Sequence, residues 1–361
     1  MFSFLKSEVL LGVSVVMAVA GFLFEHALLD AGQVAALIGA VVLVFAIVLA
    51  SMRVAHHAEV LAAKVGDPYG TMILTLSAVL VEVIILAIMM SGEEISPTLV
   101  RDTIYSAVML DINGILGLAA LLGGLKHGEQ SYNDDSSRTY SVMILTAMGI
   151  SMIVPEFVPQ AKWHLYSAFT IVAMVTLYAV FLKMQVGVHS YFFSYSYPKR
   201  EGGEKHPSQD EPVVMSITIL IIGVVIIGAL AEIMSGLLGA GLKGSGAPPV
   251  LAAIVVAAIS ASPEIMTAMR AALANRMQAV VNIALGASLS TVILTVPVME
   301  AIALYTGQPF IMAMTPVQTV MVTITLIVAA INLNDGETNA IEGMTHFVLF
   351  ATFVMLSVIG L

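Results

Sequence analysis

Apolar runs of about 20 residues recur along the whole chain, and they constrain its fold more than any other feature. Of the 361 residues, 59% are hydrophobic and 11% are charged, whereas roughly a quarter of the residues of a soluble globular protein are charged. A helical run of about 20 apolar residues spans the roughly 30 Å hydrocarbon core of a bilayer. The pattern predicts an all-α polytopic membrane protein that is surrounded by the lipid bilayer.

About eleven such runs are expected to form transmembrane helices. The expected spans are 8–28, 33–52, 69–90, 101–123, 140–155, 164–186, 213–235, 249–273, 278–303, 310–332 and 343–361. Near the end of the first run, Ala18-Val19-Ala20 resembles a signal-peptide cleavage site. However, Glu8 offsets Lys6 at the start of this run, and ten further runs follow. We therefore expect the first helix to remain uncleaved.

Lysine and arginine residues are distributed unevenly between the two sides that alternate along this order of helices. With the N-terminus in the cytoplasm, eleven of the fourteen lie on the cytoplasmic side, and Arg101, Lys162 and Lys243 lie outside. Positively charged residues concentrate in the cytoplasmic loops of membrane proteins. The bias predicts a multi-pass protein of the inner (plasma) membrane, with its N-terminus in the cytoplasm and its C-terminus outside.

The longest polar segment, residues 198–212, divides the chain into two halves of five spans each. It contains charges, glycines and prolines without apolar periodicity, which indicates a cytoplasmic linker. Because each half has an odd number of spans, corresponding helices run in opposite directions. The expected organisation is therefore an N-terminal helix (1–32), a first five-helix repeat (33–197), the linker (198–212) and a second five-helix repeat (213–361). Transporters with such inverted repeats bind their substrates near the membrane midplane.

Composition excludes several classes of function. The chain contains no cysteine, which excludes disulfides, thiolate metal sites and thiol catalysis. Its formal net charge of −10 argues against nucleic acid as a partner.

A glutamate lies near the middle of one apolar run in each half of the chain. Glu82 lies in the run 69–90, and Glu264 lies in the run 249–273. A charged side chain at the centre of a membrane helix costs about 2.5–3.5 kcal/mol on insertion scales. We expect the two carboxylates to hold one cation, Ca²⁺ or Na⁺. Because a proton and a cation compete for a carboxylate, this pair suffices for the minimal mechanism of an antiporter.

Further polar residues concentrate on these two spans and on the span that follows each of them. The candidates for additional ion or proton binding are Asp111, Asn113, Ser260, Gly286, Ser288 and Ser290. Hard cations such as Ca²⁺ take several oxygen ligands, and Pro263 is expected to free backbone carbonyls near Ile259. The alternative interpretation is that these residues only hold helices together by hydrogen bonds. For Asp111, a ligand and a hydrogen-bond partner of Asn113 are equally open.

Three segments carry a resemblance to a known family: GDPYGTMILTLSAVLVEV (66–83), SASPEIMTAMRAAL (260–273) and VNIALGASLSTVILTVPV (281–298). They resemble the two α-repeats of the cation/Ca²⁺ exchanger superfamily, and within its cation/proton exchanger group the bacterial ChaA-type Ca²⁺(Na⁺):H⁺ antiporters. The resemblance covers nearly the whole chain. It implies essential glutamates at Glu82 and Glu264, a Gly-Ser motif at Gly286 and Ser288, and a first-repeat asparagine at Asn113. The family's Gly-Asn-x-x-Glu pattern is absent before both glutamates.

The sequence thus predicts a secondary antiporter that exports Ca²⁺ from the cytoplasm against protons. Na⁺ or K⁺ on the same site is the alternative; no cofactor is expected, and the oligomeric state is left open. Two rivals belong to other classes. An intramembrane acid/base enzyme could use two carboxyl groups, but the chain shows no nucleophile motif. A passive cation channel needs a filter loop or ring, and no such loop is visible in the sequence.

A compact histidine group lies at the end of the second span. His56 and His57 are followed by Glu59, and histidine titrates between about pH 5 and 8. The interpretations are an ordinary interfacial loop, a pH sensor and a metal site. Carboxylates near the span ends, such as Glu300 and Glu232, are expected at a solvated rim, and the alternative is an ion vestibule or a proton path.

Overall fold

The structure is a computed structural model, and it describes residues 8–65, 69–90, 96–187, 190–193, 212–243, 245–246, 248, 250–308 and 310–361. Within these residues, eight helices are long and apolar enough to cross a membrane, or nine if one bent pair counts as a single span. Two shorter apolar helices are Thr75–Met90 and Pro316–Asn332. The all-α polytopic fold class is confirmed, whereas the number of eleven spans stays a prediction.

The chain folds into two compact units, each assembled from both halves of the sequence. Unit 1 comprises Met1–Ser96 and Gly203–Pro263, and unit 2 comprises Pro97–Gly202 and Glu264–Leu361. The predicted repeats divide the sequence, whereas the compact units group helices that pack together. The compact units therefore do not test the repeat boundaries. The repeat boundaries stay a prediction. Apart from Pro212, the predicted linker lies outside the described residues.

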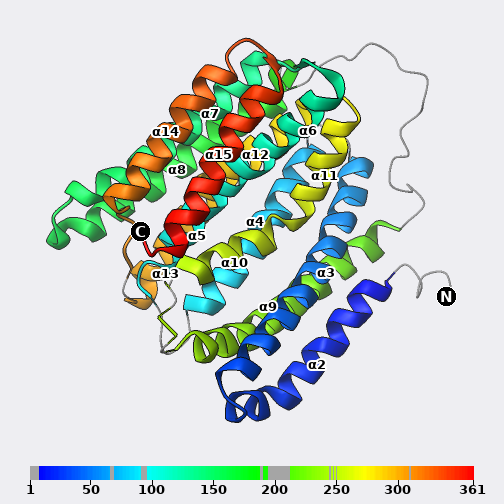
Figure 1. The fold of residues 1–361 in the computed structure, drawn as a ribbon, viewed down its shortest axis with the longest axis vertical. Coiled ribbons are helices and arrows are strands. Elements are labelled where there is room, and N and C mark those ends of the chain that lie inside the picture. Colours follow the sequence, from blue (N-terminus) through cyan, green and yellow to red (C-terminus); the bar gives the residue numbers. More distant parts are fainter. Residues whose placement is uncertain are drawn as a thin grey trace. The chain divides into compact units, whose positions relative to one another are not determined.

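Unit 1 is built around two long helices that pack along each other. Its helices are α2 (Val9–Asp30), α3 (Gln33–Val65), α4 (Tyr69–Met90), α9 (Val213–Leu242) and α10 (Val250–Ser260). α3 packs against α9, α2 contacts both, and α4 contacts α3, α9 and α10 (Figure 1). Large apolar side chains such as Phe22 and Phe45 remain mostly exposed. Exposed apolar surface of this kind suits lipid rather than water.

Unit 2 contains the remaining helices and one short pair of strands. Its α-helices are α5 (Leu99–Val108), α6 (Gly117–His127), α7 (Asp134–Met148), α8 (Trp163–Val186), α11 (Ser262–Leu273, without its first two residues), α12 (Met277–Ser290), α13 (Val296–Thr306), α14 (Pro316–Asn332) and α15 (Ala340–Val358). The short 3-10 helices are η3 (Val154–Phe157), η4 (Gln160–Lys162) and η5 (Ser190–Phe193). The strands β1 (Gln130–Ser131) and β2 (Glu337–Thr338) pair antiparallel.

Two long spans of unit 2 change from α to π geometry part of the way along. The π-helix η1 (Met109–Leu116) joins α5 to α6, and the π-helix η6 (Thr291–Thr295) joins α12 to α13. A third π segment, η2 (Gly149–Ile153), follows α7. π segments are rare and often occur at functional sites. The first two lie in the span after each predicted glutamate span, and η1 carries Asp111 and Asn113.

α6 and α15 pack with their backbones almost in contact. A Cβ atom added at Gly343 would lie 2.2 Å from the Leu121 backbone nitrogen and 2.7 Å from the Gly117 carbonyl oxygen. Only glycine permits so close an approach between membrane helices. The close packing brings the start of α15 against the span that carries η1.

We expect Gly343→Ala to destabilise unit 2, because the new methyl group meets backbone atoms that can move only if the helices separate. Overpacking of this kind costs roughly 1–3 kcal/mol. Thermal unfolding of the purified protein in detergent measures the effect. Gly149→Ala is the matched control, since an added Cβ there meets no atom within 4 Å. Equal unfolding temperatures for the two variants would contradict the packing argument.

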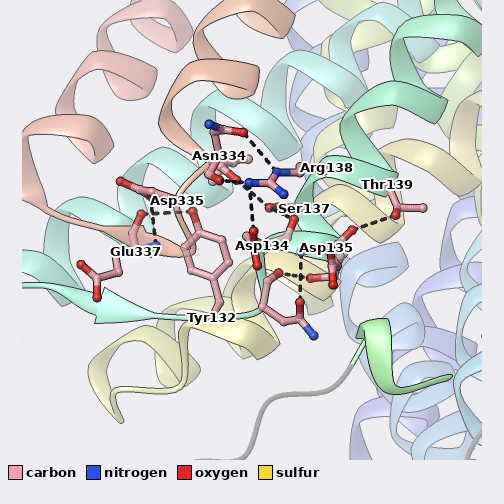
Figure 2. A network of polar contacts seen from close by, with 12 residues as sticks. Tyr132, Asp134, Asp135, Ser137, Arg138, Thr139, Asn334, Asp335 and Glu337 are labelled. Carbon is pink, nitrogen blue, oxygen red and sulfur yellow. Dashed lines mark hydrogen bonds and ion pairs between the residues drawn. The ribbon is translucent and has the colours of Figure 1, made fainter. Parts of the chain in front are cut away.

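Polar contacts tie together the loops at one end of unit 2, here called the Arg138 end (residues 127–134, 273–277 and 332–340). Arg138 donates to the Asn334 backbone oxygen at 2.7 Å and pairs with Asp134 at 3.0 Å, as Figure 2 shows. The Lys126 ammonium donates to the Leu273 carbonyl oxygen at 2.8 Å. These three loops therefore lie on one side of the membrane.

The opposite end of unit 2, here called the Arg101 end (residues 96–99, 153–162 and 307–315), is also held by hydrogen bonds. The Ile311 amide donates to the Pro97 carbonyl at 2.9 Å, and the Met314 amide donates to the Met152 carbonyl at 2.9 Å. The Arg101 guanidinium donates to the Ala313 carbonyl at 2.9 Å. The helices between the two ends thus run alternately in opposite directions, as their order in the sequence requires.

Candidate functional site

Asp111 and Ser288 meet inside unit 2, although 177 residues separate them in the sequence. The Ser288 hydroxyl donates to Asp111 Oδ2 at 3.2 Å, and both side chains are buried. Asp111 belongs to η1 and Ser288 belongs to α12. One predicted ligand from each predicted repeat is therefore brought to the same place.

Asn113 is fixed by partners from the last two helices of the chain. Its amide nitrogen donates to Thr325 Oγ1 of α14 at 2.8 Å, and its Oδ1 lies 2.9 Å from His346 Nδ1 of α15. Because an amide oxygen can only accept, His346 must donate from Nδ1, and its neutral ring then carries the proton there. Asn113 Oδ1 keeps a second lone pair that could serve a cation.

Two further candidates, Ser290 and Gly286, lie on α12. Ser290 is buried and donates to the Ala287 carbonyl at 2.9 Å, just before η6 begins. Gly286 is half-buried, and a Cβ atom added there would meet only the Tyr140 ring at 3.9–4.0 Å. Ser290 supports the backbone where α12 ends, whereas Gly286 leaves space beside Tyr140.

The span of Glu264 is broken, as Pro263 led us to expect. α10 and α11 meet at Ala261 with a bend of 56°. Proline lacks the N–H that would bond the carbonyl four residues earlier, and the Ser262 hydroxyl donates to that Ile259 carbonyl instead, at 2.8 Å. The Ser260 hydroxyl donates to the Ala257 carbonyl at 3.0 Å. The Ile259 carbonyl oxygen and the Ser260 hydroxyl oxygen each retain a lone pair for a further interaction.

Glu82 and Glu264 belong to different units, and their surroundings differ. Glu82 belongs to unit 1 and is 3% exposed within α4, beside the buried Ile85 and Leu86. Glu264 begins unit 2 and lies half-buried in the first turn of α11. The free N–H groups and the positive dipole end of a helix favour a carboxylate in its first turn.

His57 is fully buried in a polar cluster that links α2, α3 and α9 in unit 1. Its Nδ1 lies 3.3 Å from Ser216 Oγ, and its Nε2 lies 3.3 Å from Glu8 Oε1 and 3.1 Å from Arg53 Nη2. A neutral Nε2 accepts from Arg53, whereas a protonated Nε2 donates to Glu8. His56 contacts the His57 ring edge-on, with the ring centroids 5.4 Å apart. Within the described residues, no group of three or more His, Cys, Asp or Glu side chains could hold a metal ion.

This cluster predicts an acid-dependent loss of stability. Burial opposes ionisation of Glu8, but the hydrogen bond and charge of Arg53 and the adjacent His57 outweigh it and lower the pKa of that carboxyl. A carboxylate with a lowered pKa in the folded state stabilises the fold above its unfolded pKa. That contribution is lost as the pH falls through the lowered pKa of the folded state.

Thermal unfolding of the wild type and of Glu8→Gln, followed from neutral to acidic pH, tests this prediction. The two proteins should differ most at neutral pH and converge in acid. A stability difference that stays constant across the range would show that Glu8 does not act through its charge.

Two features of unit 2 were not predicted correctly from the amino-acid sequence. The partners of Asn113, Thr325 and His346, were not predicted, although a histidine inside an apolar run was a visible signal. Glu300 was expected at a solvated rim, but it is 2% exposed, because α13 packs against α8. Glu232 is exposed, as the rim interpretation implied.

Buried ionisable groups within helices of membrane length, together with a broken span, define a polytopic membrane protein that handles ions. The family model described as "Sodium/calcium exchanger protein" matches residues 35–187 and 215–359. The chain belongs to this family. It is therefore a membrane transporter and not an enzyme.

Several curated relatives are similar over most of their length. The "Putative ionic transporter y4hA" of Sinorhizobium fredii is 32% identical over 309 residues, covering 84% of each chain. The "Sodium-potassium/proton antiporter ChaA" of Escherichia coli is 32% identical over 315 residues, covering 86% of each chain. The "Ca(2+)/H(+) antiporter ChaA" of Bacillus subtilis is 24% identical, covering 72% of this chain and 74% of the relative.

Solved structures show the same fold. The structure of native YfkE has a TM-score of 0.76 and 17% sequence identity, covering 97% of this chain and 99% of the other. The H⁺/Ca²⁺ exchanger CAX has a TM-score of 0.63 and 17% identity, covering 89% of this chain and 82% of the other. At this level of sequence identity, the similarity shows a shared fold only.

Proposed function

We propose that this cation:proton antiporter exports Ca²⁺ from the cytoplasm while protons enter. One observation carries the proposal: a glutamate lies on the corresponding span of each half of the chain. Glu82 is 3% exposed in apolar α4, and Glu264 follows the break between α10 and α11. An ionisable group inside a membrane span is costly and usually functional.

In this proposal, Glu82 and Glu264 alternate between cation-bound and protonated forms. A bound proton leaves a neutral carboxyl group, and a cation displaces that proton because both need the same oxygens. A further carboxylate together with hydroxyl, amide and backbone oxygens would supply the other ligands that Ca²⁺ requires. The candidates are Asp111, Asn113, Ser288, Ser260 and the Ile259 carbonyl.

We also propose an orientation in the inner membrane. The Arg138 end of unit 2 faces the cytoplasm and the Arg101 end faces outside. The first helix then starts in the cytoplasm and α15 ends outside. The support is the distribution of Lys and Arg, of which eleven of fourteen fall on the cytoplasmic side in this arrangement.

Exchange of Na⁺ or K⁺ for protons on the same site is the second candidate. It is favoured by the relative of Escherichia coli named as a sodium-potassium/proton antiporter, at 32% identity. The relative of Bacillus subtilis that is named for Ca²⁺ is 24% identical.

Ion flux in proteoliposomes distinguishes these candidates. Vesicles with an imposed pH gradient and a lumenal pH dye receive Ca²⁺, Na⁺ or K⁺ in separate runs. Proton movement driven by Ca²⁺ alone supports the first candidate, and movement driven by Na⁺ or K⁺ supports the second. Cation flux without proton movement would contradict antiport by this chain.

A further inference from the structure

Glu300 is a buried carboxyl group that the proposed cation site does not use. It lies on α13, is 2% exposed, and faces α8. It stands ten residues after Ser290 on the same span, roughly 15 Å along a helix axis. A buried carboxyl group this far along the span from Ser288 and Ser290 needs an explanation of its own.

Two hydroxyl groups of α8 surround this carboxyl group. Thr170 Oγ1 lies 2.5 Å from Glu300 Oε2 and 2.9 Å from the Ser167 backbone oxygen. The Ser167 side chain is a second polar neighbour of the carboxyl group on α8. Thr170 is fully buried, and Ser167 is 6% exposed.

The protonation state of Glu300 is linked to the direction of the Thr170 hydrogen bond. A threonine hydroxyl carries one hydrogen, and a backbone carbonyl oxygen carries none. Thr170 must therefore donate to the Ser167 carbonyl if that contact is a hydrogen bond. In that arrangement, the hydrogen between Thr170 Oγ1 and Glu300 Oε2 comes from a neutral Glu300 carboxyl group. In the other arrangement, Thr170 donates to a Glu300 carboxylate.

The surrounding charges agree with a neutral carboxyl group. Among the described residues, no basic side chain forms an ion pair with Glu300. Tyr166 is the ionisable neighbour on α8, and its hydroxyl donates to the Ile150 carbonyl at 2.7 Å. Of the other elements packed on α13, η6 (TVILT) contains no ionisable residue. A buried carboxylate without a counter-charge is unfavourable.

The position of the group allows exchange with water at one membrane surface. Glu300 lies six residues before the end of α13, roughly 9 Å along the helix axis, and Ser167 lies four residues after the start of α8, roughly 6 Å. Both helix ends belong to the Arg101 end of unit 2. In the proposed orientation, this is the side from which protons enter.

We infer that Glu300 is a second proton-binding site of this transporter, separate from Glu82 and Glu264. It binds a proton on Oε2 and exchanges it at the Arg101 end. On release, the proton leaves to water, and the Thr170 hydroxyl rotates from the Ser167 carbonyl to donate to the carboxylate. Rebinding reverses both steps, so that atoms and charge balance. The inference holds for whichever cation is carried.

Infrared difference spectroscopy of the full-length protein in lipid, without transported cation, tests the site. The wild type should show a neutral-carboxyl carbonyl band that is absent from Glu300→Gln and that disappears reversibly as the pH is raised. Glu156→Gln is the matched control, because Glu156 is an exposed glutamate at the same end, and it should keep the band. Thr170→Val should shift the band, since the acceptor of the carboxyl proton is removed.

Two results would overturn the inference. One is a neutral-carboxyl spectrum identical in the wild type and in Glu300→Gln, with no shift in Thr170→Val. The other is a band assigned to Glu300 that does not respond to pH. Because no transported cation is present, failure here is distinct from failure of the proposed Ca²⁺ exchange.

Discussion

Glu82→Gln should abolish cation:proton exchange while the protein remains folded. Glutamine has the shape of a protonated glutamate, so the packing within α4 is preserved. It can neither ionise nor offer two carboxylate oxygens to a cation. Removing one partner from a buried charge contact costs about 3–5 kcal/mol, and each 1.4 kcal/mol is about tenfold in affinity. Exchange in proteoliposomes should therefore fall by about 100-fold or more.

Glu232→Gln is the matched control for this experiment. It removes a glutamate from the same unit, on α9, where the side chain is exposed. Its exchange should equal that of the wild type. If Glu82→Gln kept wild-type exchange for every cation tested, Glu82 would have no part in the cycle.

Asn113→Leu should destabilise unit 2 and also stop exchange. Leucine fills a similar volume but leaves the Nδ1–H of His346 without an acceptor and removes the donor to Thr325. Each buried polar group left without a partner costs about 1–3 kcal/mol. Thermal unfolding in detergent should show a loss of roughly 2–6 kcal/mol, and vesicles should show little exchange.

Asn113→Asp provides the control, since its protonated carboxyl group can donate to Thr325 Oγ1 and accept from His346 Nδ1, as Asn113 does. It should recover most of the stability that the leucine variant loses. An Asn113→Leu protein as stable as the wild type would mean that the contacts with Thr325 and His346 do not hold Asn113 in place.

The features that the sequence predicted well are local ones. The span 69–90 coincides with α4, because a single apolar run specifies a membrane helix without help from its neighbours. The break before Glu264 was predicted from Pro263, because the loss of one N–H acts within a single turn.

The features that escaped prediction depend on contacts between distant parts of the chain. Asn113 bonds to Thr325 and His346, which lie 212 and 233 residues away. Glu300 stands close to a predicted span end, and only the packing of α8 determines that it is buried. The π segments η1 and η6 have no marker in apolar periodicity, since they change the winding of a helix that is apolar in either form.

The central claim is that Glu82 and Glu264 bind the transported cation and protons in competition. The most direct test measures proton release when Ca²⁺ binds to the purified protein in weakly buffered detergent solution. Binding to the wild type should release protons, in a number that falls as the pH rises and the carboxyl groups are already ionised. Glu82→Gln and Glu264→Gln should each reduce both binding and release. Ca²⁺ binding without proton release in the wild type, or release that persists unchanged in both variants, would contradict the account.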